Sequence, residues 1–293
     1  MNAKSLILLR TLLKSTSYMN ILKTTNDRKK KGKIIGSYIG MAILYLMLIA
    51  YCLLMVVGYA FFSLQEQMPQ LTAIVICTLS FVFTLLKAGS YLFGFSEYEM
   101  LMALPFGEKT IVESKFMYMY IKNLPWNLTI SIVVLAGYFF LVQPPIFVIP
   151  LWIILSLFLP VIPMLVARFL SFLIARIGTM FKHWRVVQTI LTFAFVMLAF
   201  SARFIVESLF RNNEVQDALE NFSTTATRIG KYYLPIGWFG KAVSEGSIIY
   251  GILLIGLTVF LYELVFNIIS LFYKKMNSIM KTGAVTGHDY KEH

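Results

Sequence analysis

The sequence predicts an all-α integral membrane protein with six transmembrane helices, and its composition, its apolar runs and its charge placement all predict this. Apolar residues make up 58% of the 293 residues and charged residues only 14%, whereas soluble domains carry roughly 25% charged residues. Six apolar stretches approach or exceed the ~20 residues that a helix needs to cross a bilayer. They run over 34–63, 71–93, 126–142, 147–174, 187–209 and 247–272.

The placement of lysine and arginine predicts the orientation of these spans. With the N-terminus inside, the inner segments hold nineteen of the 26 basic residues, the outer segments hold four, and the others lie within spans. This bias agrees with the positive-inside rule, so both termini are expected in the cytoplasm, beneath a bacterial cell membrane. The net charge of +12 therefore indicates topology and lipid phosphates, and no nucleic-acid partner is expected.

The first 33 residues are expected to lie on the cytoplasmic surface of the membrane. Leu6, Leu9 and Leu13 share one helical face and basic side chains take another, which predicts an amphipathic interfacial helix over 1–23. The basic run 28–33 follows it and would be attracted to anionic lipid.

The other expected divisions follow from the spans. They are a six-span domain over 34–274, with a cytoplasmic loop at 94–125 and an external loop at 210–246, and a cytoplasmic tail over 275–293. The fourth span contains Pro150, Pro160 and Pro163. Because proline removes a helical hydrogen bond and clashes with the preceding turn, this span is expected to be kinked or broken.

The cytoplasmic loop is expected to contain a short helix with a defined start and end. Ser96 and Glu99 have the S-x-x-E spacing of a capping box, and Pro105 biases the residue before it away from helical geometry. A helix of two turns cannot cross a bilayer. It is partly apolar and exposed to cytoplasm, so it is expected to need a partner that covers it.

A second capping box is expected immediately afterwards. Thr110 and Glu113 repeat the spacing and would open a helix over Ile111–Leu124, which Pro125 would end. The loop is therefore predicted to be a helix, a break and a second helix.

The external loop carries an aromatic segment just before the sixth span. Tyr232, Tyr233, Pro235 and Trp238 lie within a stretch that proline and glycine interrupt. Aromatic rings of this kind favour the level of the lipid headgroups. A re-entrant-like helical segment is expected here.

The motifs of catalysis are missing from the sequence. Gly107–Thr110 ends like a Walker A motif but lacks the G-x-x-x-x-G lead, so this chain is not expected to hydrolyse ATP. There is also no nucleophile elbow and no H-E-x-x-H motif. The three histidines do not pair with cysteine or histidine at ligand spacing, so neither an enzyme nor a metal site is expected.

Five ionisable residues lie in or near the apolar core and are candidates for the pathway or for salt bridges. Arg203 and Glu207 are four residues apart and are expected to pair. Lys87 and Arg168 can extend toward the cytoplasm. For Glu263 we expect a salt bridge to Lys87 or Arg168, and a proton relay is the alternative.

The pattern resembles the membrane permease subunits of bacterial ABC exporters, of the type-2 class and the Gram-positive kind. Four features carry the resemblance. They are the basic N-terminal helix, the segment Ser96–Pro105, Ser114-Lys115 after it, and Leu234-Pro235 with Trp238. Related permeases often have a second six-span half, and the 293 residues hold one set of six expected spans. The expected partner is therefore a second half or a copy of this chain, and a truncated version of a longer permease is the remaining alternative.

The resemblance implies that Ser96–Pro105 is a coupling helix that binds in a groove of a separate ATPase subunit. That ATPase, acting as a dimer, would bind ATP and Mg, and no cofactor is expected in this chain. The residues that the resemblance assigns to this contact are the acidic Glu97 and Glu99, the apolar Met100, Leu101 and Leu104, and the terminating Pro105.

The expected function is outward transport of an amphipathic peptide, lipid or drug-like molecule. One alternative is a stand-alone secondary transporter driven by protons through Glu263. Another is a non-transporting membrane protein for immunity or assembly. An embedded enzyme has the least support.

Overall fold

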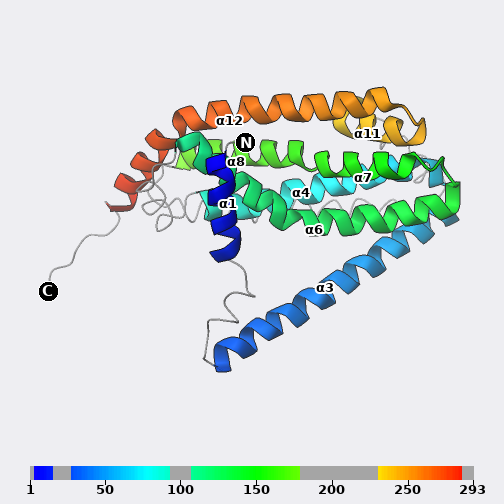
Figure 1. Ribbon diagram of the computed structural model, residues 1–293, viewed down its shortest axis with the longest axis horizontal. Coiled ribbons are helices and arrows are strands. Elements are labelled where there is room, and N and C mark those ends of the chain that lie inside the picture. The colour runs from blue at the N-terminus through cyan, green and yellow to red at the C-terminus, as the bar shows by residue number, and fades with distance from the viewer. Residues whose placement is uncertain (1–2, 16–27, 93–106, 179–229, 286–293) are drawn as a thin grey trace, which may run out of the picture.

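A computed structural model describes residues 3–15, 28–92, 107–178 and 230–285, and it has only helical elements within these ranges (Figure 1). In chain order they are α1 (Ala3–Ser15), α3 (Arg28–Phe61), the short 3-10 helix η1 (Gln65–Gln67), α4 (Met68–Leu92), α6 (Glu108–Val142), α7 (Val148–Phe158), α8 (Val161–Gly178), α11 (Leu234–Ser244) and α12 (Ile248–Val285).

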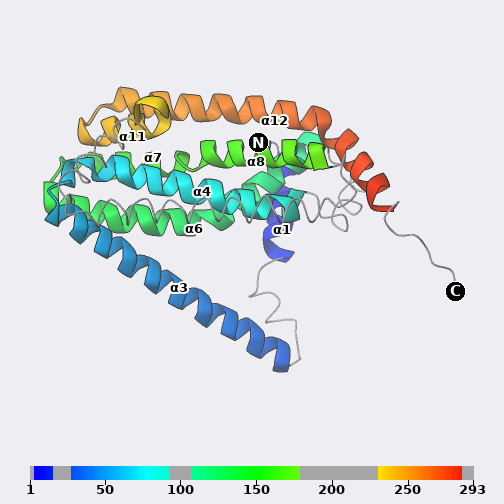
Figure 2. The same ribbon diagram turned by 180° about the vertical axis from the view of Figure 1, so that it is seen from behind.

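Five helical stretches are long and apolar enough to cross a membrane, which makes this a multi-pass all-α protein. They are Lys31–Phe61, Gln65–Leu85, Lys109–Val142, Val148–Leu170 and Ile248–Ile268, and they overlap five of the six expected spans. The expected span 187–209 lies outside the described residues. The described helices on either side of it, α8 and α11, end and begin at opposite ends of the bundle (Figures 1 and 2).

The bundle consists of α4, α6, α7 with α8, and α12, lying side by side. Helix α1 crosses one end of these helices and α11 packs at the other, while α3 diverges from the bundle toward its own N-terminal end (Figures 1 and 2). We call these the α1 end and the α11 end. A helix that crosses the long helices has the orientation of a helix on a membrane surface; the expected interfacial placement of the N-terminal helix stays a prediction.

The break predicted in the fourth span is confirmed. Helix α7 ends at Phe158 and α8 begins at Val161, with Pro160 between them. Pro150 and Pro163 lie in the first turns of α7 and α8, where the missing amide hydrogen has no helical acceptor to lose.

The break predicted at Pro125 is wrong, because α6 runs continuously through this residue. Phe116 before it and Ile130 after it are both buried, so packing on both sides holds one helix despite the lost hydrogen bond. The helix also begins earlier than expected. Its N-cap is Gly107, which makes no side-chain capping bond, so the predicted capping box at Thr110 does not start it.

Two further boundaries differ from the expectation at the N-terminus. The basic run 28–33 belongs to α3 instead of preceding a span as a separate segment. In α1 the buried side chains are Ser5, Leu8 and Leu9, whereas Leu6 is 54% exposed. The buried face is therefore rotated from the predicted leucine face, because α1 packs against α6 and not against lipid alone.

Candidate functional site

The predicted coupling segment lies outside the described residues, but the two helices that lead into and out of it are described. Helix α4 ends at Leu92 and α6 begins at Glu108, both at the α1 end (Figures 1 and 2). The assigned residues of the segment, which the structure does not describe, are Glu97, Glu99, Met100, Leu101, Leu104 and Pro105.

The first turns of α6 are buried against α1. Leu8 and Leu9 pack with Ile111 and Phe116 of α6 in one apolar cluster. The Ser114 hydroxyl is fully buried and lies 3.1 Å from the carbonyl oxygen of Ser5 and 2.7 Å from that of Thr110. Ser114 therefore links the backbone of α1 to α6, a contact that the sequence resemblance did not specify.

Charged side chains are buried in the same region. Glu113 and Lys115 of α6 are 6% and 4% exposed, and Arg168 of α8 is 0% exposed. The Arg168 Nη1 donates to the Met119 sulfur at 3.0 Å, and its Cζ lies 5.8 Å from the centre of the Phe116 ring. Arg168 is therefore enclosed by the bundle, and its expected extension toward the cytoplasm stays a prediction.

Glu263 makes its ion pair with Lys109, a residue that sequence reasoning did not consider. The Lys109 Nζ lies 3.1 Å from Glu263 Oε2 and 2.9 Å from Asn267 Oδ1. Because α6 begins at Glu108 and packs against α12, Lys109 lies beside α12 and not in a separate loop. The described ion pair of Glu263 is thus with Lys109 and not with the expected Arg168, while the expected pairing with Lys87 lies outside the described side chains.

Three of the predicted intramembrane charges cannot be located by their side chains. Lys87 lies in α4, whose side chains are described only up to Leu85, and Arg203 and Glu207 lie outside the described residues. Their expected roles stay predictions.

A buried polar layer between α4 and α6 was missed at the sequence level. Ser80 and Thr84 of α4 are 0% and 1% exposed, and Asn123 and Asn127 of α6 are 4% and 5% exposed. The Ser80 hydroxyl lies 3.1 Å from Asn127 Oδ1. Ser80 and Thr84 are four residues apart, as are Asn123 and Asn127, so each pair lies on one face of its helix. This spacing was the signal in the sequence that could have revealed the polar layer.

Much of the hydrogen-bonding capacity of this polar layer is unused. The buried atoms Thr84 Oγ1, Asn123 Oδ1 and Asn127 Nδ2 have no hydrogen-bond partner in the structure. An unsatisfied buried polar atom costs about 1–3 kcal/mol. Polar side chains kept at this cost inside a membrane bundle are candidates for function.

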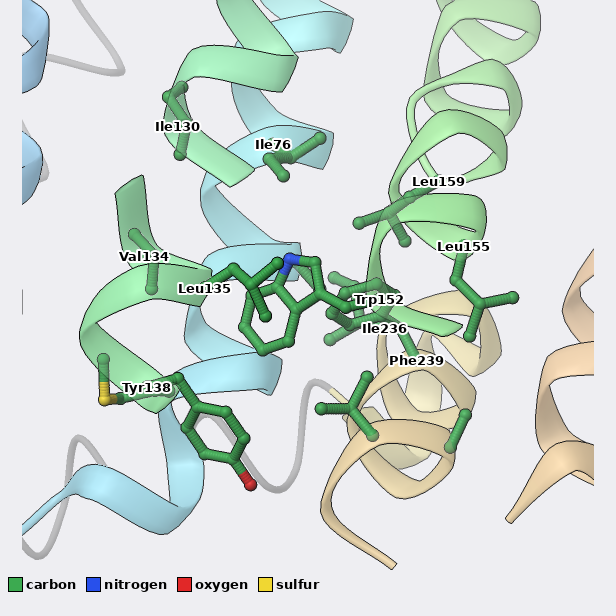
Figure 3. Close-up of a cluster of buried hydrophobic side chains, with 14 of the residues drawn as sticks. Ile76, Ile130, Val134, Leu135, Tyr138, Trp152, Leu155, Leu159, Ile236 and Phe239 are labelled. Carbon is green, nitrogen blue, oxygen red and sulfur yellow. The ribbon is translucent and has the colours of Figure 1, made fainter. Parts of the chain in front are cut away.

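The α11 end is built around a fully buried tryptophan (Figure 3). Trp152 Nε1 donates to Ser131 Oγ at 2.9 Å, and the Trp152 ring lies 5.4 Å from Phe239 of α11 and 5.6 Å from Tyr138 of α6. At 11 residues, α11 is too short to span a bilayer.

The residues predicted for this aromatic segment differ in their exposure. Tyr232 is 89% exposed, and Trp238 is partly buried. Pro235 is buried in the first turn of α11, where proline is well tolerated. Burial, with a smaller contribution from nearby Cys77, raises the pKa of the Tyr233 phenol; its hydroxyl is buried without a hydrogen-bond partner.

A close backbone contact fixes the entry to α11. A Cβ added at Gly237 would collide with the carbonyl oxygen of Gly230, so only glycine allows this approach. The segment leads into α11, which packs against α4, α7 and α12 of the bundle.

No family model, curated protein or solved structure matches the chain. A function can therefore be argued only from the structural features described above.

Proposed function

We propose that this chain is the permease subunit of an ATP-driven exporter that moves an amphipathic peptide, lipid or drug-like molecule outward. A separate ATPase subunit, acting as a dimer, would supply ATP hydrolysis. It would bind the segment Ser96–Pro105, and a second permease half or a second copy would complete the transporter.

The observation that carries this proposal is the position of that segment between two core helices. Helix α4 packs against α6, α8 and α11, and α6 packs against α1, α3, α7 and α12. A displacement of Ser96–Pro105 would therefore act on two helices that together contact every other described helix longer than one turn. Such rigid-body transmission is a standard way to couple a motor to a membrane bundle.

The continuity of α6 adds support. With 35 residues it is roughly 52 Å long, and it joins the α1 end to the α11 end (Figure 1). At the α11 end, Tyr138 of α6 contacts Trp152, which contacts Phe239 of α11. A tilt of α6 would thus be passed to α11 through packed rings.

The proton-driven alternative draws no support from the described contacts of Glu263. Its side chain is 54% exposed and pairs with Lys109, which gives it a role in joining α12 to α6. The non-transporting alternative has no described contact that favours it.

The test is purification of the tagged full chain from its native membrane in a mild detergent, followed by mass spectrometry of the proteins that come with it. We expect an ATPase subunit, and we expect Leu101→Asp plus Leu104→Asp to reduce its recovery about tenfold or more. The matched control is Ile248→Asp plus Ile249→Asp, at two exposed positions at the α11 end. It should retain the ATPase; unchanged recovery in the first double variant contradicts the docking assignment.

A further inference from the structure

Helix α1 holds the first turns of α6 with its inner face. Leu8 and Leu9 are 4% and 7% exposed, and they pack in one apolar cluster with Ile111 of α6. The carbonyl oxygen of Ser5, which lies on the same face, is 3.1 Å from the Ser114 hydroxyl. These turns belong to the end of α6 that follows the proposed docking segment. Whatever holds α1 in place therefore acts on that end of α6.

The outer face of α1 combines basic and apolar side chains. Leu6, Arg10 and Lys14 follow one another at intervals of four residues and so share one face. All three are exposed, Leu6 by 54%, and the neighbouring Ile7 is 62% exposed. The helix contains no acidic residue. An exposed face of this composition is typical of a helix that lies on an anionic membrane surface.

A second group of basic side chains lies at the same level of the molecule. Helix α1 crosses the long helices at the level where α3 begins (Figures 1 and 2). The first turns of α3 contain the basic run 28–33, in which Lys29 and Lys33 are exposed. Two separate segments thus present positive charge at one level across the end of the spans. The phosphates of a leaflet would form a plane of the opposite charge at such a level.

We propose that α1 is a lipid-responsive link, which binds an anionic leaflet with its outer face and holds the start of α6 with its inner face. A helix of 13 residues is marginal on its own. Each of the two contacts favours the helical state that the other needs, so each strengthens the other. Anionic lipid therefore stabilises the first turns of α6. This regulation goes beyond the proposed function and does not depend on an ATPase partner.

The test places the purified full chain in nanodiscs of phosphatidylcholine, with or without phosphatidylglycerol, and measures hydrogen exchange by mass spectrometry. Each basic residue near an anionic surface strengthens binding about fivefold. We therefore expect phosphatidylglycerol to slow the exchange of the α1 amides about tenfold or more. The amides in the first turns of α6 should also exchange more slowly. Added salt should abolish both effects, because it screens exposed charges.

Three variants separate the lipid contact from the contact with α6. Arg10→Gln plus Lys14→Gln should lose the response to phosphatidylglycerol in both helices. Lys231→Gln plus Lys241→Gln, at two exposed basic positions at the α11 end, is the matched control and should keep it. Ser114→Ala removes the hydrogen bond to α1 and should reduce the response of α6 more than that of α1.

Three results would overturn the inference. One is equal exchange in the two lipids, and another is an unchanged response when Arg10 and Lys14 are neutralised. The third is protection of α1 without any protection of α6, which would leave α1 as a membrane anchor alone. None of these results bears on whether an ATPase subunit co-purifies, so the proposed function stands or fails separately.

Discussion

The substitution Phe239→Ala tests whether α11 is held to the bundle by its packing on Trp152. Phe239 is fully buried and makes an edge-to-face contact with the Trp152 ring at 5.4 Å. Truncating a buried phenylalanine to alanine costs about 3–5 kcal/mol. Since each 1.36 kcal/mol is a factor of ten, the detached fraction of α11 should rise by about two to four orders of magnitude.

Hydrogen exchange of the α11 amides, followed by mass spectrometry, measures that fraction. A detached helix of 11 residues is marginal in water, so its amides exchange once it leaves the bundle. The control is Tyr232→Ala, which removes an aromatic ring that is 89% exposed and should leave protection unchanged. Equal protection in Phe239→Ala and wild type would refute the reasoning that this ring anchors the segment.

Three further predictions concern hydrogen bonds and ion pairs. Tyr233→Phe removes a buried hydroxyl that has no hydrogen-bond partner, so the Tm should stay unchanged or rise. Tyr120→Phe loses a 2.7 Å hydrogen bond, so the free energy of unfolding should fall by about 0.5–1.5 kcal/mol. Glu263→Gln breaks a pair with Lys109 whose side chains are 54% and 42% exposed, so stability should fall by only about 0–1 kcal/mol; a much larger loss would show that the pair is structurally essential. Ser114→Ala removes the link to α1 and should speed limited proteolysis at the N-terminus, and an unchanged cleavage rate would contradict that role.

Apolar run length was sufficient to predict the helical class and most span positions. The break between α7 and α8 also followed from local chemistry, because Pro160 cannot continue the helix that precedes it. Pro125 has the same chemistry, yet α6 continues through it because buried side chains on both sides pack into the bundle. Sequence alone shows the proline but not the packing that overrides it.

The contacts between helices were less predictable than the helices themselves. The partner of Glu263 depended on where α6 begins and on which helix lies beside it, so Lys109 was not considered. The polar layer was visible as Ser80 with Thr84 and Asn123 with Asn127, each at i, i+4 spacing. That these two pairs face one another follows only from the antiparallel packing of α4 on α6.

The central claim is that an ATPase subunit binds the segment between α4 and α6. Its most direct test is cross-linking in native membranes from a single cysteine at Leu101→Cys, after the buried Cys52 and Cys77 have been replaced by alanine. Ile248→Cys, at an exposed position at the α11 end, is the matched control. We predict a cross-linked ATPase subunit from position 101 and none from position 248; no ATPase at position 101, or equal yields at both, would contradict the claim.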